Sequence, residues 1–204
     1  NGSSLLYSTF IGGSGDEAPH SMVTNDAGEL YIMGTTGSSN YPTSALCYDG
    51  SFNGGTLYNQ NVVDFPSGCD IVITKLNTAG SAILSSTFVG GTGNDGLNNV
   101  TGLNRNYADE FRGEIILDGA GNCYVASTTN STNFPVVNGL TSRGGSSDGV
   151  VFKLNSTLTT LIWSTHIGGS GNDALYGIQQ DATGNTFVTG GTSSTNLSSA
   201  QNSN

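Results

Sequence analysis

An internal repeat constrains the fold of this chain more than any other feature of its sequence. Residues 6–17, 84–95 and 162–173 share a strand-like run, a Gly-Gly-Ser/Thr-Gly loop and an acidic residue at the last position. They begin at residues 6, 84 and 162, so both spacings are 78 residues. Self-similarity at a fixed period is the mark of a chain that stacks one small structural unit several times.

Two further segments recur in the same order. A short turn followed by a strand-like run occupies residues 25–34, 118–127 and 181–190, and an Asp-x-Val-x-x-Lys-Leu-Asn run occupies residues 70–77 and 148–155. The equal spacing conceals two 15-residue insertions, one between Pro42 and Asp70 and one between Asp95 and Asp118. Without them the unit is about 63 residues, which accommodates four short strands and their loops.

The local pattern of each unit predicts strands and tight turns. Residues 71–74 and 150–153 are β-branched or aromatic runs bounded by Gly and Asn, and such runs favour strands. Turns such as Asn77–Gly80 and Asp118–Gly121 combine a side chain that bonds its own backbone with a glycine that tolerates positive φ. No segment sustains a helical period. We therefore expect an all-β fold of four-stranded antiparallel repeats, as in β-propeller blades.

Composition excludes several classes of function. The 204 residues carry a net charge of −10 with only five Lys and Arg, so the chain cannot neutralise a nucleic-acid backbone. No apolar run approaches the ~20 residues that span a bilayer. Disorder is the remaining competitor, but 35% hydrophobic residues arranged in short β-type runs argue against it. We expect neither nucleic-acid binding nor membrane insertion.

Several of these motifs together resemble a known family. The run at residues 7–16, the Gly-Asn-x-Phe-Val-Thr-Gly run at 184–190, Asn-Phe-Pro at 133–135 and the Asp-x-Val-x-x-Lys-Leu-Asn run are similar to the bacterial seven-bladed-propeller repeat (SBBP) family. The resemblance covers nearly all of the chain outside the insertions and tails. It implies β-propeller blades in secreted or cell-surface proteins and no single activity. The sequence departs from the pattern at Asn25, at Cys123 and at both insertions.

The position of the blade boundaries follows from loop length. Connections within a propeller blade are usually short, so we place the boundaries in the longest and most variable connection. This assignment of strands to blades, which we call the phase, places strand a, the innermost strand of a blade, at 70–76 and 148–154. It places strand b, the next strand outward, at 5–11, and it predicts about two complete blades and one partial blade. The whole chain is then one repeat array, divided as follows: 1–36 partial first blade, 37–69 insertion between blades, 70–128 second blade with an insertion near 96–113, 148–192 third blade, and 193–204 polar tail.

This phase leaves the first blade without its inner strand. Strand 5–11 would then expose one edge, and unpaired edges attract further strands. We expect further blades of a longer chain, or other copies of this chain, to cover it.

Four aspartates form two candidate metal sites. Asp70 and Asp95 are 25 residues apart, as are Asp148 and Asp173, and the phase above brings each pair together beside Gly-rich loops. Carboxylate and carbonyl oxygens suit a hard cation such as Ca²⁺. The alternative is that each aspartate bonds loop amides and holds the turn. No cofactor is required by the sequence, and calcium is the candidate.

The insertions supply the candidate ligand-binding face, because binding residues concentrate on variable loops. Their aromatic side chains could stack on sugar rings, and the acidic pair Asp109–Glu110 could contact a substrate. The alternatives are that the aromatics pack against the sheets and that the acids lie on a solvated loop. The residues of this face are Tyr48, Phe52, Tyr58, Tyr107, Asp109 and Glu110.

Low Lys with abundant Ser, Thr, Asn and Gly is typical of an extracellular or cell-surface protein. In that compartment Cys47 and Cys69 flank the first insertion and are predicted to form a disulfide, with Cys123 left as a buried thiol. Glycosylation sequons begin at Asn99, Asn130, Asn155 and Asn196, and they matter only if the source organism modifies them.

Three functions follow, in order of preference. The first is a non-catalytic secreted or surface propeller module for adhesion or scaffolding, with surface glycans or proteins as partners. The second is a self-assembling extracellular fibre or sheath subunit completed by strands of neighbouring copies. The third, more distant, is a carbohydrate-binding or carbohydrate-acting domain. No Ser/His/Asp or Cys/His spacing indicates a nucleophile, so we expect no enzymatic activity.

Overall fold

The computed structural model describes residues 3–60, 63–106, 108–141 and 144–197. The fold is all-β, as predicted, with 41% strand. The one helical element among these residues is the short 3₁₀ helix η1, Asp109–Phe111. No helix in the described part is long and apolar enough to cross a membrane.

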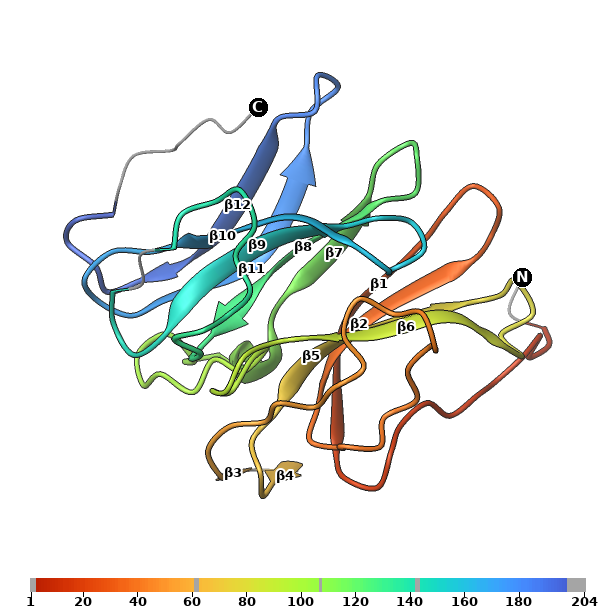
Figure 1. Ribbon diagram of the computed structural model, residues 1–204, viewed down its shortest axis with the longest axis horizontal. Coiled ribbons are helices and arrows are strands. Elements are labelled where there is room, and N and C mark those ends of the chain that lie inside the picture. The colour runs from red at the N-terminus through yellow and green to blue at the C-terminus, as the bar shows by residue number, and fades with distance from the viewer. Residues whose placement is uncertain (1–2, 61–62, 107, 142–143, 198–204) are drawn as a thin grey trace.

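The strands form two four-stranded antiparallel sheets and two two-stranded ones (Figure 1). The first sheet has the order β1 (Glu17–Thr24), β2 (Leu30–Thr36), β5 (Asp70–Leu76), β6 (Ile83–Val89). The second has the order β7 (Glu114–Leu117), β8 (Cys123–Thr129), β9 (Asp148–Leu154), β10 (Leu161–Ile167). The third pairs β11 (Asp173–Gln180) with β12 (Thr186–Thr192), and the first insertion holds a small hairpin of β3 (Tyr58–Gln60) and β4 (Val63–Phe65).

The hairpin turns form where the sequence predicts them. Asn25, Asp118 and Asp181 each accept the backbone N–H of the residue four positions later through a side-chain oxygen, at 2.9 Å in all three turns. The glycine that ends the turn has φ of +79°, +79° and +90° respectively, a region that side chains with a Cβ rarely adopt. The first strand of each sheet is thereby joined tightly to the second.

Successive sheets pack face to face through shared apolar cores. Met33 and Ile73 of the first sheet lie in one cluster with Val125 and Phe152 of the second. The opposite face of the second sheet, including Tyr124 and Val151, packs against Leu175, Ile178 and Val188 of the third. Each four-stranded sheet therefore contributes alternate residues to two different cores, as the two-residue period of a strand requires.

The predicted blade boundaries are wrong. β2 pairs with β5 along its whole length, across the long connection 37–69, and β8 pairs with β9 in the same way. The insertion 37–69 thus lies within the first sheet, and the stretch 96–113 lies between sheets. The units are 17–89 and 114–167 followed by 173–192, instead of 1–36, 70–128 and 148–192.

The error has a physical cause. Loop length is a poor guide because the insertion has its own packing: Tyr41 and Phe52 lie against Val72 and Phe88 on the outer face of the first sheet. Lengthening a connection that packs on the sheet in this way adds little free energy, since the entropic cost of loop closure grows slowly with length. Strand pairing sets the boundary instead.

The predicted strand 5–11 is also absent. These residues form no strand in the structure, and Phe10 is fully exposed, whereas its repeat equivalent Phe88 is 1% exposed. β6 and β10, the equivalents of this segment, exist because they pair with β5 and β9. Among the described residues no strand of that kind lies beside residues 5–11, and the sheets do not close into a ring.

The predicted disulfide does not form, because Cys47, Cys69 and Cys123 are all free. Cys69 is buried in a cluster with Ala18, Phe65 and Leu97, while Cys47 lies in a partly exposed turn in which its N–H donates to Ser44 O. The two cysteines therefore belong to different environments. Cys123 is a buried thiol, as expected.

The shared core predicts a large difference between two phenylalanines. Phe152→Ala removes a fully buried ring between two sheets and should lower the free energy of unfolding by about 3–5 kcal/mol. Phe187→Ala, at a ring that is 58% exposed, is the matched control and should change it by less than about 1 kcal/mol. Urea unfolding measures both, and equal losses would show that the sheets do not share this core.

Candidate functional site

The acidic residue that ends each repeated segment holds the glycine loop before it. Glu17 accepts the Gly13 N–H at 3.1 Å, Asp95 accepts the Gly91 N–H at 2.7 Å, and Asp173 accepts the Gly169 N–H at 2.8 Å. This is the turn-holding alternative weighed for the aspartates. We call each loop and its partners a loop clamp.

A second motif completes each loop clamp. A Thr-x-Ser-x-Asn run follows the second strand of each sheet, at residues 36–40, 129–133 and 192–196. Its serine donates a hydroxyl to the acid and accepts the N–H of the last loop glycine, at 2.7, 2.8 and 2.9 Å for Ser38, Ser131 and Ser194. Its asparagine accepts the N–H of the loop Ser or Thr at 2.8–2.9 Å.

The second glycine of the loop is required by this arrangement. A Cβ on Gly13, Gly91 or Gly169 would lie 2.5–2.7 Å from the Cβ of the clamp serine, closer than real side chains approach. The Gly-Gly-Ser/Thr-Gly sequence is therefore explained by close backbone approach.

The predicted carboxylate pairs do come together. A Cβ on Gly90 would meet Asp70 Oδ1 at 2.5 Å and Asp95 Oδ2 at 2.8 Å, and Asp148 and Asp173 face Gly168 in the same way. Asp70 Oδ2 accepts the N–H groups of Asn53 and Gly54, at 2.6 and 3.2 Å, so this aspartate also anchors the first insertion. Burial, together with the nearby Asp95, raises the pKa of Asp70 to about 7.

The two aspartate pairs are the predicted calcium-binding positions. The described residues contain no group of three or more His, Cys, Asp or Glu side chains that could hold a metal ion. At each pair the second carboxylate, Asp95 or Asp173, already accepts a loop amide and a serine hydroxyl. A cation there would have to use the remaining oxygen atoms, of which Asp70 Oδ1 is buried without a hydrogen bond.

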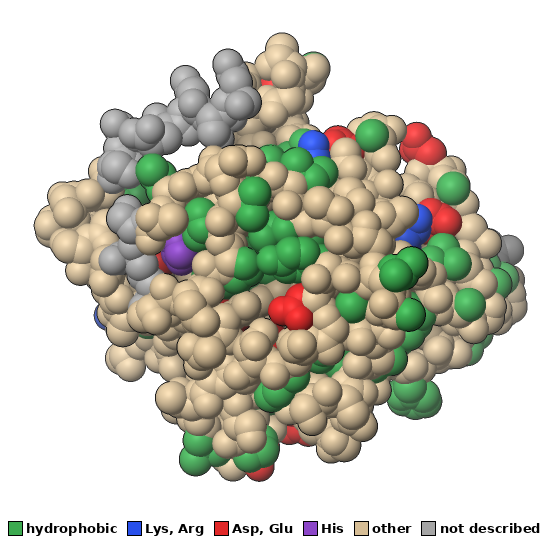
Figure 2. Space-filling model, in the orientation of Figure 1, with side chains coloured by type: hydrophobic (Ala, Val, Ile, Leu, Met, Phe, Trp, Pro, Cys, Tyr) green, Lys and Arg blue, Asp and Glu red, His purple; other side chains and the backbone are tan. Residues whose placement is uncertain are grey.

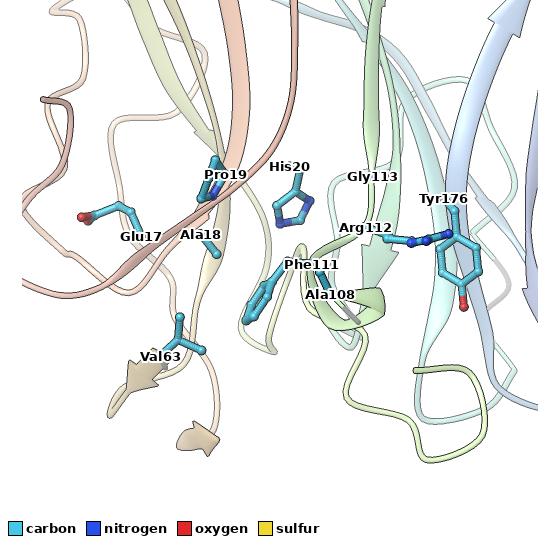
Figure 3. Close-up of a pocket in the computed structure, with 10 residues that line it drawn as sticks. All are labelled: Glu17, Ala18, Pro19, His20, Val63, Ala108, Phe111, Arg112, Gly113 and Tyr176. Atoms are coloured by element: carbon cyan, nitrogen blue, oxygen red, sulfur yellow. The ribbon is translucent and has the colours of Figure 1, made fainter. Parts of the chain in front are cut away.

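A cavity of about 480 Å³ lies between the first strands of the three sheets (Figure 3). His20, Gly113 and Tyr176 each stand five residues before the hairpin turn of their sheet, and all three line the cavity. Figure 3 shows His20 between Pro19 and Phe111, with Arg112 and Tyr176 on the far side. The wall thus combines two aromatic side chains, one imidazole and one guanidinium.

The contacts of His20 define its tautomer. Thr35 Oγ1 lies 2.9 Å from His20 Nε2 and 3.1 Å from Gly96 O. Since the single hydroxyl proton of Thr35 goes to the carbonyl, His20 donates through Nε2–H and Nδ1 is a bare acceptor. Burial lowers the pKa of His20 to about 3, so the ring is neutral at physiological pH.

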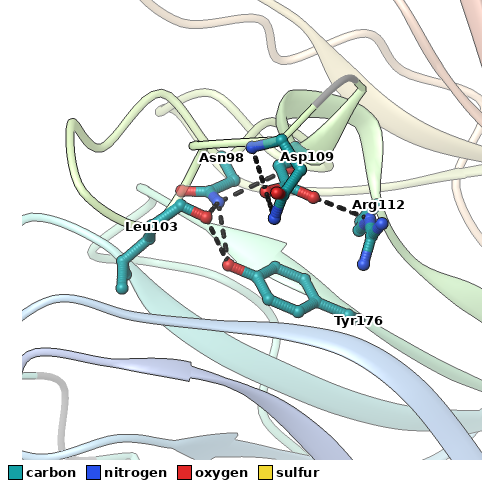
Figure 4. A network of polar contacts seen from close by, with 6 residues as sticks. Asn98, Leu103, Asp109, Arg112 and Tyr176 are labelled. Carbon is teal, nitrogen blue, oxygen red and sulfur yellow. Dashed lines mark hydrogen bonds and ion pairs between the residues drawn. The ribbon is translucent and has the colours of Figure 1, made fainter.

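A polar network holds the second insertion beside this cavity (Figure 4). Tyr176 donates to Leu103 O at 2.6 Å, and Asn98 Nδ2 donates to the same carbonyl at 3.0 Å. Asp109 accepts the N–H of Asn106 at 2.7 Å and pairs with Arg112 Nε at 2.8 Å. The network fixes the loop against β11.

The structure places the predicted ligand-face residues mostly in packing positions. Tyr58 is buried against Phe65 and Phe111. Phe52 packs edge-on against Phe88. Tyr48 is half-buried against the core shared by the first and second sheets. Asp109 is buried in its network and Glu110 is partly buried; Tyr107 lies outside the described residues. The buried members of this set cannot present a sugar platform.

The sequon asparagines are engaged in local hydrogen bonds. Asn155 accepts the Thr159 N–H in its turn, Asn196 belongs to the third loop clamp, and Asn130 Nδ2 donates to Asn99 Oδ1. Only Asn99 and Asn196 are exposed.

Comparison with known proteins assigns no relationship. No protein-family model matches the chain, and no curated protein matches it.

Two features of the site were missed from the sequence. The Thr-x-Ser-x-Asn run is visible in the sequence as a fourth segment that recurs between copies. The cavity position could have been found by aligning the three turns at Asn25, Asp118 and Asp181, because five residues before each turn stand His20, Gly113 and Tyr176.

The buried Asp70 predicts a pH-dependent stability. Its pKa is about 7 in the folded chain and ordinarily 3.8, so between these values the folded state holds a proton that the unfolded state has lost. The free energy of unfolding should therefore fall as pH rises from about 4 to about 7. Asp70→Asn, which still accepts the Asn53 and Gly54 N–H groups, should remove this decline.

Urea unfolding at pH 4, 5.5 and 7, with a chelator present, measures the effect. The wild type should lose a few kcal/mol relative to Asp70→Asn across this range. Asp26→Asn, a change in an exposed turn residue, is the control and should follow the wild type. Parallel curves for Asp70→Asn and wild type would contradict the assignment.

Proposed function

We propose that this chain is a non-catalytic repeat module of β-propeller type blades that acts as an extracellular adhesion or interaction scaffold. One observation carries the proposal: the residues that recur between copies serve to hold loops and to align sheets. The carboxylates, hydroxyls and amides of the three loop clamps bond each other and the backbone. What varies between copies is the insertions.

The SBBP resemblance supports the same proposal, since sheets that pack serially through shared cores are what blades of that family imply. In this reading the first two sheets are blades, and β11–β12 begins a third. Calcium is proposed only as an accessory ion at the Asp70–Asp95 and Asp148–Asp173 pairs. Neither the scaffold role nor the location depends on it.

The exposed residues 5–10 favour the second candidate, a subunit completed by other copies. Leu5, Leu6 and Phe10 are 81%, 91% and 103% exposed, and apolar exposure on this scale marks an interaction site. The cavity beside His20 and Tyr176 is the observation that favours a carbohydrate ligand, because aromatic and cationic groups share one wall.

The proposal is tested on immobilised polysaccharides and extracellular proteins, with the same polysaccharides in solution as substrates. The expected result is saturable binding to at least one surface and release of no product. Turnover of any substrate, lost in Asp109→Asn or His20→Gln, would contradict the non-catalytic role. Absence of binding to every surface would contradict the adhesion role.

A further inference from the structure

The outer edge of β12 lacks a neighbour that its equivalents possess. β2 pairs with β5, and β8 pairs with β9, but within the described residues β12 pairs only with β11. Phe187 of β12 is 58% exposed, while its equivalents Tyr31 and Tyr124, which each pack in the core shared with the next sheet, are 0% and 8% exposed.

In both complete sheets a lysine covers this aromatic position. Lys75 lies opposite Tyr31 in the strand register, 5.2 Å above its ring, and its Nζ is 2.6 Å from Glu29. Lys153 lies opposite Tyr124, 4.6 Å above its ring, and its Nζ is 3.1 Å from Asp118. Each lysine therefore combines a cation–π contact with an ion pair to the acid of the adjacent turn.

The third sheet contains the aromatic ring and the acid of this arrangement. Phe187 occupies the ring position, and Asp181 occupies the position of Asp118. Hydrogen bonds from Asn185 and Thr183 lower the pKa of Asp181 to about 2, so it is an anion at all ordinary pH values. Of the ion pairs between described residues, none involves Asp181.

Residues 5–10 are exposed, and the equivalents of segment 5–11 pair with the same kind of strand. Its equivalents β6 and β10 pair with β5 and β9 on the edge that β2 and β8 leave free. Among the described residues, no strand of the β5 type lies beside β12 or beside residues 5–11. If two copies were joined head to tail, β11 and β12 of one copy and residues 5–11 of the next would form a three-stranded sheet without the β5-type strand.

We propose that the edge of β12 is a docking site for one extended strand with the pattern Asp-x-Val-x-x-Lys-Leu, bound antiparallel with its lysine over Phe187 and paired with Asp181. Backbone hydrogen bonds supply affinity, and the lysine fixes the register. The inference rests on the blade-type repeat of the proposed function and names the partner of its open edge.

The test appends a copy of residues 148–154 to the full chain through a linker that reproduces the length of the 130–147 connection. Hydrogen exchange of the β12 amides is compared in the chain with and without this extension. We expect the extension to slow exchange of the amides that β11 leaves unpaired by at least about tenfold. A Lys153→Glu change made only in the appended copy should lose about threefold to tenfold of that protection.

A charge swap distinguishes specific recognition of the lysine by Asp181 from nonspecific pairing of a strand with the edge of β12. Asp181→Lys in the chain should restore protection to the extension that carries Lys153→Glu. Equal protection by both extensions, or failure of the swap to restore it, would overturn the proposed register. No protection of β12, with the first two sheets still protected, would overturn the docking site and leave the proposed scaffold intact.

Discussion

The structure depends on one interaction, a side-chain carboxylate that accepts the amide of a glycine loop four residues before it. This bond is made by Glu17, Asp95 and Asp173, and in each case a serine from the end of the second strand bonds both the acid and the loop. The loops at 90–93 and 168–171 follow the last strand of one sheet and are bonded to the residues that end the second strand of the next sheet. The loop at 12–15 is bonded in the same way beyond the end of β2. The clamps at 90–93 and 168–171 therefore tie successive sheets together.

The same placement creates the cavity. His20, Gly113 and Tyr176 stand at equivalent positions, five residues before the hairpin turn of each sheet, and line a common space. The large side chains at the first and third positions and the glycine at the second leave room between them. The second insertion then closes one side, with Asp109, Arg112 and Tyr176 bonded into a network.

Local features of the fold were predictable from sequence. Turns such as Asp118–Gly121, and strands such as β5 and β9, follow from side-chain hydrogen bonding, positive φ and β-branched composition, all of which act over a few residues. The pairing of Asp70 with Asp95 followed from repeat spacing.

The predictions that failed required long-range information. β2 pairs with β5 across 37–69 because that insertion packs on the sheet. Residues 5–11 form no strand because a strand needs a neighbour. Burial of Tyr58 and Asp109 likewise depends on partners distant in sequence.

The most direct measurement of the central claim is the exchange rate of three glycine amides, Gly13, Gly91 and Gly169, by ¹H–¹⁵N NMR. The loop clamp predicts that all three exchange more slowly than the amide of Gly119, which lies in the exposed turn 118–121. Protection should be greatest at Gly91, which is buried and whose N···O distance to the acid is shortest, 2.7 Å. Exchange of the three amides at the rate of Gly119 would contradict the account.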